Sequence, residues 1–324
     1  MKTSFSSLID RYIKLKQSLG RGFSVERRVL KHLDDFLRAA DATDLTRVEF
    51  ESWCKVQVHV SSGVRRNRMR IVRNFCLYRR RTKPDCFVPD DHVFPAPHQV
   101  VQPHIFSELE IARLLQATAN VPSSPRFVLR SLALRLSIIL LYTTGLRRGE
   151  LVRLVLSDYD QRERTLLIRD SKFHKSRCLP LSEDASTELD AYLTARRKLL
   201  LPMLLDSPLL WSGGASERGF SASALTQNMH MLCRAANVRK SDGQLPRIHD
   251  YRHSFAIAAL LRWYRAGADI QAKLPMLATY MGHVSIASTE YYLPFISDLA
   301  SAASDRFCSK YGTLVQPLCE GGAS

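Results

Sequence analysis

Apolar residues recur every three or four positions through most of the first hundred residues, which is the spacing of helices with one buried face. The first such run stops at Gly20. Its apolar positions are Leu8, Tyr12, Leu15 and Leu19. Residues 29–37 repeat the pattern, and residues 64–81 form a third run in which apolar positions are interspersed with arginines. The pattern predicts several amphipathic helices in this part of the chain.

Helical periodicity is lost between residues 83 and 103, where five prolines occur. We expect a linker over about residues 83–106, because proline-rich stretches do not continue helices. Ser107 then begins a Ser-Glu-Leu-Glu sequence that is typical of a capping box at a helix start. The apolar face of this helix is expected to include Leu109, Leu114 and Leu115. The 324 residues also exceed what one core of ordinary size requires. We therefore predict two domains, 1–102 and 107–300, followed by a C-terminal tail over 301–324.

The pattern changes to short alternating runs after residue 154. The three runs LVLSDYD, TLLIRD and RCLPL are separated by turns near Gln161 and His174. Apolar alternation over a few residues indicates strands with one buried face, and the short separations favour hairpins. The sequence therefore predicts a small antiparallel sheet.

Helices are expected on both sides of this sheet. Residues 126–143 form a largely apolar run that Gly145 closes, and Ser182 is placed to cap a helix after the third strand. Residues 221–292 are mostly helical again, with breaks expected near Ser241–Pro246 and Leu274–Pro275. The predicted fold class is therefore mainly α with a small antiparallel β-sheet.

The charge of the chain points to a polyanionic partner. Lys and Arg number 47 against 31 Asp and Glu, which gives a net charge of +16. Such an excess is most often found in proteins that bind nucleic acid. A solvated face is the usual explanation of an arginine-rich helix, but eight arginines in 17 residues favour contact with DNA phosphates. These arginines are Arg65, Arg66, Arg68, Arg70, Arg73, Arg79, Arg80 and Arg81.

Other features of the sequence exclude several classes of protein. The seven cysteines are scattered and form no CxxC pair, which favours a reducing compartment and argues against a zinc or redox site. The N-terminal residues do not form a signal peptide, and the most apolar stretch, residues 132–142, is too short to cross a bilayer. We expect a cytoplasmic protein with no membrane partner.

Four short segments in the second half carry side chains suited to phosphate chemistry, although each alone has an ordinary explanation. In TTGLRRGELVRL, Arg147 lies at a helix start, where an arginine more often pairs with a carboxylate such as Glu150. The lysines of DSKFHKSRCLPL lie in a predicted hairpin, where lysines are usually only solubilising. RIHDYRHSFA places His249 and Arg252 three apart on one helix face, and YMGHVSIASTEYY contains His283 and two tyrosines.

In this order the segments resemble the tyrosine recombinase (phage integrase) superfamily, which shares its catalytic architecture with type IB topoisomerases. The family pattern has an Arg in GLRxxEL, a Lys in a GKGxKxRxxPL hairpin, an HxxRH box, a GH or GW dipeptide, and a Tyr nine residues after that last His. The matching elements here are GLRRGEL, SKFHKSRCLPL, HDYRH, GH and a tyrosine at the same spacing. The resemblance implies a helical DNA core-binding domain before the catalytic domain. It implies as catalytic residues Arg147, Lys172, His249, Arg252, His283 and Tyr292.

Two of these assignments rest on alignment or spacing alone. Residues 173–174 are Phe-His where the family usually has Gly-Asn, so Lys172 is chosen over Lys175 by alignment to the Arg-x-x-Pro-Leu that follows. Tyr291 stands directly before Tyr292, and the spacing of nine residues selects Tyr292 as the nucleophile.

The chemistry of the residue types agrees with the resemblance. Attack on a phosphodiester brings an anionic nucleophile to an anionic centre, so fixed cations around the phosphate oxygens stabilise the transition state. Arg147 and Arg252 suit this role, and His283 would hydrogen-bond a phosphate oxygen. His249 would accept the phenol proton, and Lys172 would protonate the leaving 5′ oxygen. The predicted activity is site-specific recombination through a covalent 3′-phosphotyrosine.

No cofactor is expected for this activity. Rejoining uses the energy kept in the phosphotyrosine bond, and the sequence has neither a GxxxxGK[ST] loop nor an HExxH motif. The resemblance implies double-stranded DNA as the partner. It also implies four protomers on two duplexes, identical or mixed with related recombinases, with each tail reaching a neighbour.

Two other functions stay open at this point. A type IB topoisomerase-like enzyme would use the same chemistry on one duplex, and an accessory protein would bind DNA but rely on a partner recombinase for cleavage. Within the superfamily, RWYRAG followed by KLPMLATYMGH is similar to transposon-borne integrases. This similarity favours a role in DNA integration by a mobile element.

Overall fold

The computed structural model describes residues 4–96, 102–122, 127–169, 176–213 and 219–283. The chain divides into two compact units, residues 1–102 and 103–324, and each has a hydrophobic core of its own. None of the helices in the described ranges is both long and apolar enough to cross a membrane.

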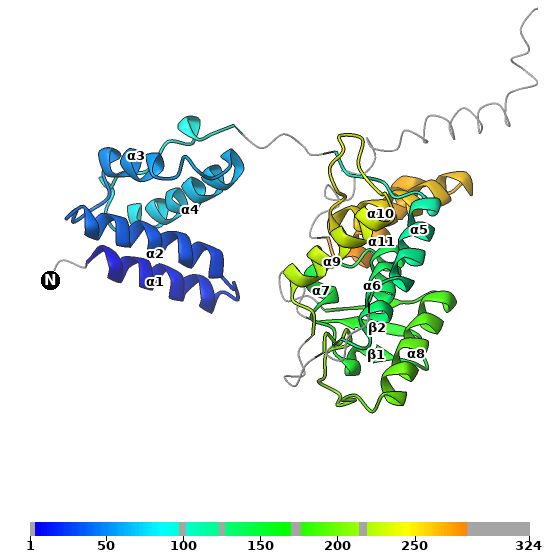
Figure 1. Cartoon of the computed structure of the whole chain (residues 1–324). Helices are drawn as coiled ribbons and strands as arrows, with labels where there is room; N and C mark the ends of the chain where they lie inside the picture. Colours follow the sequence, from blue (N-terminus) through cyan, green and yellow to red (C-terminus); the bar gives the residue numbers. More distant parts are fainter. Residues whose placement is uncertain (1–3, 97–101, 123–126, 170–175, 214–218, 284–324) are drawn as a thin grey trace, which may run out of the picture. The chain divides into compact units, whose positions relative to one another are not determined.

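The described part of the first unit is helical. Its elements are α1 (Phe5–Ser18), α2 (Ser24–Ala39), α3 (Arg47–Lys55), α4 (Ser62–Arg80) and a 3-10 turn at Asp91–Val93. Figure 1 shows α1 beside α2, and α2 also contacts α3 and α4. The core between them contains Trp53 and Phe75, both fully buried.

The buried face of α1 differs from the predicted one. Leu15 and Leu19 are exposed, and the buried positions are Phe5, Ile9, Tyr12 and Ile13. The helix has two neighbouring apolar lines, and aromatic packing decides between them. The rings of Phe5 and Tyr12 lie 5.6 and 5.5 Å from the ring of Phe75.

The proline-rich stretch is only partly a linker. Cys86 and Phe94 are buried, and Phe94 belongs to the core of the first unit. Phe87 and Val88 pack against the same core. The linker therefore begins later than residue 83, because apolar residues between the prolines attach this segment to the helices.

The second unit contains the predicted combination of helices and a small sheet, which confirms the fold class. The helices are α5 (Glu108–Ala119), α6 (Arg130–Thr144), α7 (Arg148–Leu151), α8 (Glu183–Lys198), α9 (Ala222–Ala235), α10 (Ile248–Arg265) and α11 (Ile270–Met281). The strands are β1 (Tyr159–Asp160), β2 (Thr165–Ile168) and β3 (Arg177–Pro180). They pair antiparallel in the order β1-β2-β3, with Leu166 opposite Leu179.

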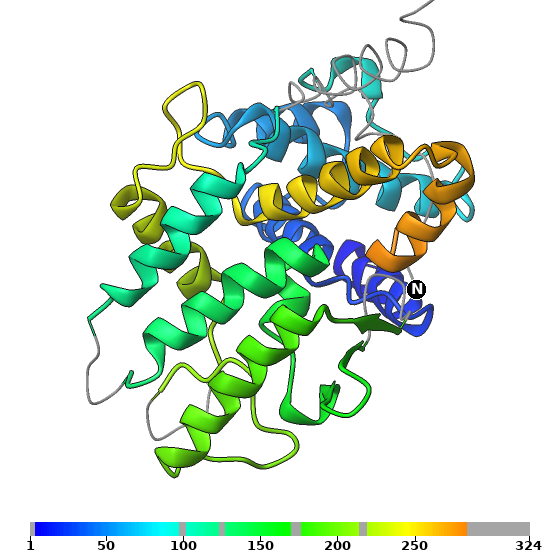
Figure 2. The same cartoon turned by 90° about the vertical axis from the view of Figure 1, so that its right-hand side faces the viewer.

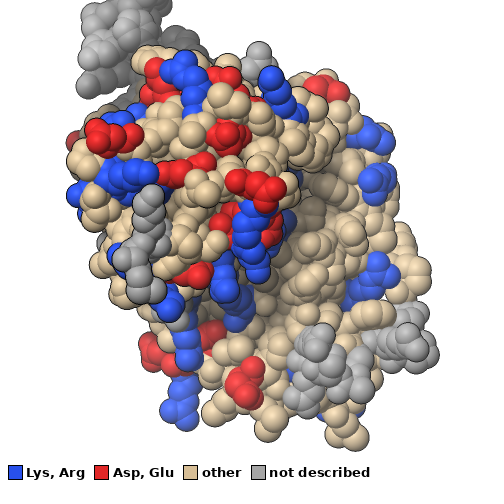
Figure 3. All heavy atoms as spheres, turned by 90° about the vertical axis from the view of Figure 1, so that its left-hand side faces the viewer, with Lys and Arg blue, Asp and Glu red and all other residues tan. Residues whose placement is uncertain are grey.

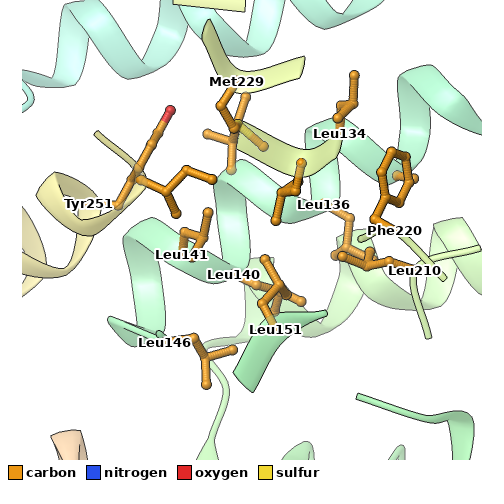
Figure 4. Packing of buried hydrophobic residues seen from close by; sticks show 14 of the residues in the cluster. Leu134, Leu136, Leu140, Leu141, Leu146, Leu151, Leu210, Phe220, Met229 and Tyr251 are labelled. Carbon is orange, nitrogen blue, oxygen red and sulfur yellow. The ribbon is translucent and has the colours of Figure 1, made fainter. Parts of the chain in front are cut away.

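Helix α6 is the centre of the second unit. It contacts α5, α8 and α10, and Figure 2 shows α5 and α8 on either side of it while α10 crosses their ends. Figure 4 shows Leu136 and Leu140 of α6 among side chains from other elements, including Leu151 and Met229. Because α6 is apolar on nearly every side, the elements packed around it are fixed relative to one another.

Helix α5 begins as the sequence predicts but buries a different set of leucines. The hydroxyl of Ser107 accepts the N–H of Glu110 at 3.2 Å, and the Glu110 carboxylate accepts the N–H of Ser107 at 2.9 Å. Leu114 is buried, but Leu109 is exposed. The apolar face expected for the first turn is therefore wrong.

The expected break at Pro275 is also wrong. Pro275 lies inside α11, and the chain turns instead at Gly267, which has φ +74°. A proline removes the hydrogen bond to the carbonyl four residues earlier, here that of Gln271. Both residues are exposed, so water can satisfy the carbonyl that the proline leaves unpaired.

Candidate active site

Arg147 is positioned by the turn between α6 and α7. Gly145 ends α6 with φ +62°, and a Cβ at this position would lie 2.6 Å from Cδ1 of Phe255. Arg147 then caps α7, and its own N–H donates to Oε2 of Glu150 at 2.9 Å. Glycine is the residue that fits both the backbone conformation and the space at this turn.

Within the described residues, the guanidinium of Arg147 makes two hydrogen bonds. Nη1 donates to Oε1 of Glu150 at 2.7 Å, and Nη2 donates to the carbonyl of Gly282 at 2.7 Å. The ordinary explanation, pairing with Glu150, is therefore correct for one of the bonds. The other bond brings Arg147 to the turn that precedes His283. The side chain is 26% exposed, so it is still accessible from solvent.

Arg252 lies on α10 and is almost completely enclosed, with 1% of its surface exposed. Nη1 donates to the carbonyl of Gly145 at 2.6 Å, and Nη2 donates to the carbonyl of Met281 at 2.6 Å. One guanidinium thus joins the end of α6 to the end of α11. Because Arg252 is fixed at two points, its position does not depend on its own helix alone.

The start of α10 is built like the start of α7. Arg247 precedes the helix, its N–H donates to Oδ2 of Asp250 at 2.8 Å, and Asp250 is fully buried. This cap places His249 in the first turn, one helical turn before Arg252. The ring of His249 meets that of His253 edge to face, with centroids 4.8 Å apart.

Burial and nearby cations lower the pKa values of the histidines. Burial, followed by the charges of Arg252 and Arg147, lowers the pKa of His283 from 6.5 to about 3. Burial also lowers the pKa of His249, again with Arg252 as the strongest charge. Both imidazoles are therefore neutral near pH 7, and a neutral imidazole can accept a proton or donate one hydrogen bond.

Arg177 stands at the start of β3, and in the sequence it serves only to align the hairpin with the family pattern. Its Nη1 and Nη2 donate to Oε1 and Oε2 of Glu150 at 3.1 and 3.0 Å, and its Nε donates to the carbonyl of Tyr280 at 2.8 Å. Glu150 is 2% exposed at its side chain. Burial would raise the pKa of Glu150, but the bonds from Arg177 and Arg147 outweigh it and lower the pKa to about 2.

Three successive carbonyls at the end of α11 each bind a different arginine. Tyr280, Met281 and Gly282 accept from Arg177, Arg252 and Arg147, in that order. Gly282 has φ +66°, and a Cβ there would lie 2.8 Å from Nη1 of Arg177. The turn before His283 is thus closed around guanidinium groups from three other elements.

The structure therefore brings together four of the six residues that the sequence singles out. Arg147, His249, Arg252 and His283 share one locality, as the hydrogen bonds and the electrostatic effects on the histidines show. The two others, Lys172 and Tyr292, lie outside the described residues, as do Lys175, Tyr291 and the tail over 301–324.

The arginines of α4 differ in how exposed their side chains are, and therefore in whether they can contact DNA. Arg79 is 3% exposed, forms an ion pair with Asp44 and lies over the ring of Phe5 with its Cζ 4.9 Å from the centroid. This burial excludes Arg79 from the predicted DNA contacts. Arg66 donates to the carbonyl of Pro95 at 2.6 Å, and Arg73 lies 3.7 Å from a carboxylate oxygen of Asp91.

The remaining predicted arginines, four on α4 and one directly after it, are partly or fully exposed. They are Arg65, Arg68, Arg70, Arg80 and Arg81. Figure 3 shows that Lys and Arg side chains on the face drawn there are interspersed with Asp and Glu side chains. The basic surface is therefore not an uninterrupted patch on that face.

Within the described ranges, three potential metal ligands come together at Asp90, Asp91 and His92. All three are exposed and belong to the first unit. Exposed acidic groups of this kind are common without a metal.

Comparisons with known proteins agree with this arrangement. Residues 105–294 match the model of the phage integrase family. The integrase/recombinase y4rE of Sinorhizobium fredii is 33% identical over 306 residues, which cover 92% of this chain and 94% of that protein. Tyrosine recombinase XerD of Rhizobium meliloti is 32% identical over 191 residues, which cover 59% of this chain and 56% of that protein.

A solved structure shares the fold. The XerH site-specific recombinase, in its post-cleavage complex with palindromic difH substrate, superposes with a TM-score of 0.63. The two chains are 19% identical, and the match covers 93% of this chain and 84% of that one. The likeness concerns the backbone arrangement alone.

Proposed function

This chain belongs to the phage integrase family and is a tyrosine-type site-specific recombinase, and we propose that Arg147, His249, Arg252 and His283 bind the DNA phosphate that it breaks. Two guanidinium groups meet at adjacent carbonyls directly before His283. The proposal depends above all on this proximity of the Arg147 and Arg252 guanidinium groups. Arg147 and Arg252 come from elements separated by about a hundred residues, so no local sequence pattern produces their proximity.

The proposed roles follow from the charges and protonation states. A phosphodiester under attack gains negative charge on its non-bridging oxygens, and arginines hold that charge without losing their own proton. Neutral His249 accepts the phenol proton of the nucleophile, and neutral His283 donates a hydrogen bond to a phosphate oxygen.

Each step forms one phosphoester bond for each one that it breaks, so the reaction needs no added energy source. We assign Tyr292 as the nucleophile: its oxygen forms a bond to phosphorus while the bond from phosphorus to the 5′ oxygen breaks. Lys172 supplies the proton that the 5′ oxygen takes up. Attack of a new 5′ hydroxyl reverses each of these changes, so the number of phosphoester bonds stays constant.

We propose double-stranded DNA as the partner of both units. In the first unit, exposed arginines such as Arg70, Arg80 and Arg81 contact the phosphate backbone, where Arg79 cannot. Strand exchange involves two duplexes, and we propose four protomers for it, as the family resemblance implies. The similarity of RWYRAG and KLPMLATYMGH to transposon-borne integrases favours a mobile element as the origin of the DNA.

A trapping experiment tests the proposed nucleophile. The purified chain is incubated with nicked duplexes that carry the ends of its own element, and covalent adducts are separated on denaturing gels. We expect an adduct with the unchanged chain and with Tyr291→Phe, and none with Tyr292→Phe. Loss of the adduct in the Tyr291 variant alone would contradict the assignment. Relaxation of supercoiled plasmid without recombinant product would favour a topoisomerase-like enzyme.

A further inference from the structure

We propose that Arg177 is a positioning residue of the active site, which acts through Glu150 to keep Arg147 free to bind the DNA phosphate. The proposal rests on the function proposed above, because it concerns the arginine that this function places on the phosphate. Arg177 itself is only 11% exposed at its side chain and does not need to touch DNA.

The geometry shows an unequal sharing of one carboxylate between two arginines. Arg177 binds both oxygens of Glu150 with its two terminal nitrogens, at 3.1 and 3.0 Å. The side chain of Arg147 binds only Oε1, and its backbone N–H takes Oε2. Arg177 therefore has the two-pronged contact that is the stronger of the two for a guanidinium and a carboxylate.

This sharing decides where the charge of Glu150 acts. A single carboxylate can cancel one guanidinium, and the forked contact assigns that role to Arg177. A buried carboxylate without a full partner is strongly unfavourable. If Arg177 were absent, Glu150 would draw Arg147 into its own forked contact. Arg147 would then present less positive charge, in a different orientation, to a phosphate.

Arg177 also fixes the turn to which Arg147 is attached. Its Nε donates to the carbonyl of Tyr280, two residues before the carbonyl of Gly282 that Arg147 holds. Gly282 leaves room for the Arg177 guanidinium, since a Cβ there would approach Nη1 to 2.8 Å. Arg177 therefore holds both groups that the Arg147 side chain contacts, which are Glu150 and the turn at the end of α11.

A charge-balance experiment separates this role from general stabilisation. The rate of adduct formation at saturating nicked DNA is measured for the unchanged chain, Arg177→Met, Glu150→Gln and the double variant. We expect Arg177→Met to reduce the rate on the order of 100-fold, the size of effect seen when one charge-stabilising donor is removed. Adding Glu150→Gln removes the charge that captures Arg147, so we expect the double variant to recover about tenfold.

A matched pair controls for the loss of an ion pair as such. Arg135 on α6 and Glu188 on α8 form an arginine–glutamate pair in the same unit. Arg135→Met and its double variant with Glu188→Gln should leave the adduct rate within twofold of the unchanged chain. A double variant Arg177→Met/Glu150→Gln that is slower than Arg177→Met would overturn the proposal. Absence of adduct with the unchanged chain would instead contradict the proposed function.

A second measurement needs no DNA. Arg177 is among the cations that lower the pKa of His283, after burial, Arg252, Arg147 and His249. Removing this charge should raise the pKa of His283, which NMR titration of the imidazole C–H signals measures in the folded chain. The Arg135→Met variant should leave that titration unchanged. An unchanged His283 titration in Arg177→Met would show that Arg177 does not occupy this position.

Discussion

Replacing Gly145 by alanine tests how closely the turn before Arg147 is packed. Gly145 and Gly267 both have left-handed backbone, with φ of +62° and +74°. A Cβ at Gly145 would lie 2.6 Å from the Phe255 ring, whereas none of the described atoms lies within 4 Å of the Cβ position at Gly267. The two glycines therefore share the backbone strain and differ in the steric contact, which makes Gly267→Ala the matched control.

The expected losses follow from these two contributions. Left-handed backbone costs an alanine about 1–2 kcal/mol, and this applies to both variants. Moving the Phe255 ring adds a further overpacking penalty of about 1–3 kcal/mol to Gly145→Ala alone. For a unit of this size, each kcal/mol lowers the melting temperature by about 2–4 °C. Gly145→Ala should therefore melt roughly 2–12 °C below Gly267→Ala.

Thermal unfolding of the full chain measures the difference, because both glycines lie in the second unit. A second readout is the rate of adduct formation. The carbonyl of Gly145 accepts a hydrogen bond from Arg252, so a displaced turn should slow the reaction, while Gly267→Ala should not. Equal melting temperatures for the two variants would refute the packing argument.

Two further predictions concern pH and DNA binding. The free energy of unfolding should decrease as the pH falls from about 6.5 toward 4. Burial keeps the pKa of His253 at about 4 and that of His283 at about 3 in the folded chain. The histidines of the unfolded chain therefore take up protons in this range while the folded ones do not. His283→Gln should flatten this slope in urea titrations between pH 7.5 and 5, and an unchanged slope would contradict the burial of a neutral imidazole. Replacing Arg70, Arg80 and Arg81 together by glutamine should reduce the steepness of log affinity against log salt for duplex DNA by about 0.9 for each phosphate that the variant no longer neutralises. Arg79→Gln should leave that slope unchanged and cost about 2 kcal/mol of stability, because it removes the ion pair between the buried Arg79 side chain and the partly exposed Asp44. A smaller slope with Arg79→Gln would show that this side chain contacts DNA.

Local signals in the sequence are sufficient to predict much of the fold. The capping box at Ser107 and the end of α6 at Gly145 depend on a few adjacent residues, and the structure confirms both. The face that a helix buries depends on the neighbours it meets, so the predictions for Leu15 and Leu109 are wrong. The prediction of a break at Pro275 fails because the tolerance of this proline depends on solvent at Gln271, which the sequence does not show.

The sequence likewise predicts some features of the candidate site and not others. His249 and Arg252 are three residues apart on one helix, so their common face can be predicted from spacing. The contact of Arg177 with Glu150 joins β3 to α7 over 27 residues, and nothing in either segment marks the pairing. The bonds from Arg252 to backbone carbonyls are invisible in the sequence, because every residue has a carbonyl.

The three carbonyls at the end of α11 have a consequence for the electrostatics of the phosphate position. A helix leaves its last carbonyls without partners and carries partial negative charge at this end. These dipoles attract and orient Arg177, Arg252 and Arg147, yet a carbonyl, unlike a carboxylate, has no net charge with which to neutralise a cation. The helix end thus aligns the three guanidinium groups without neutralising them. Because the charge of Glu150 is taken up mainly by Arg177, the fields of Arg147 and Arg252 are left available to an incoming anion.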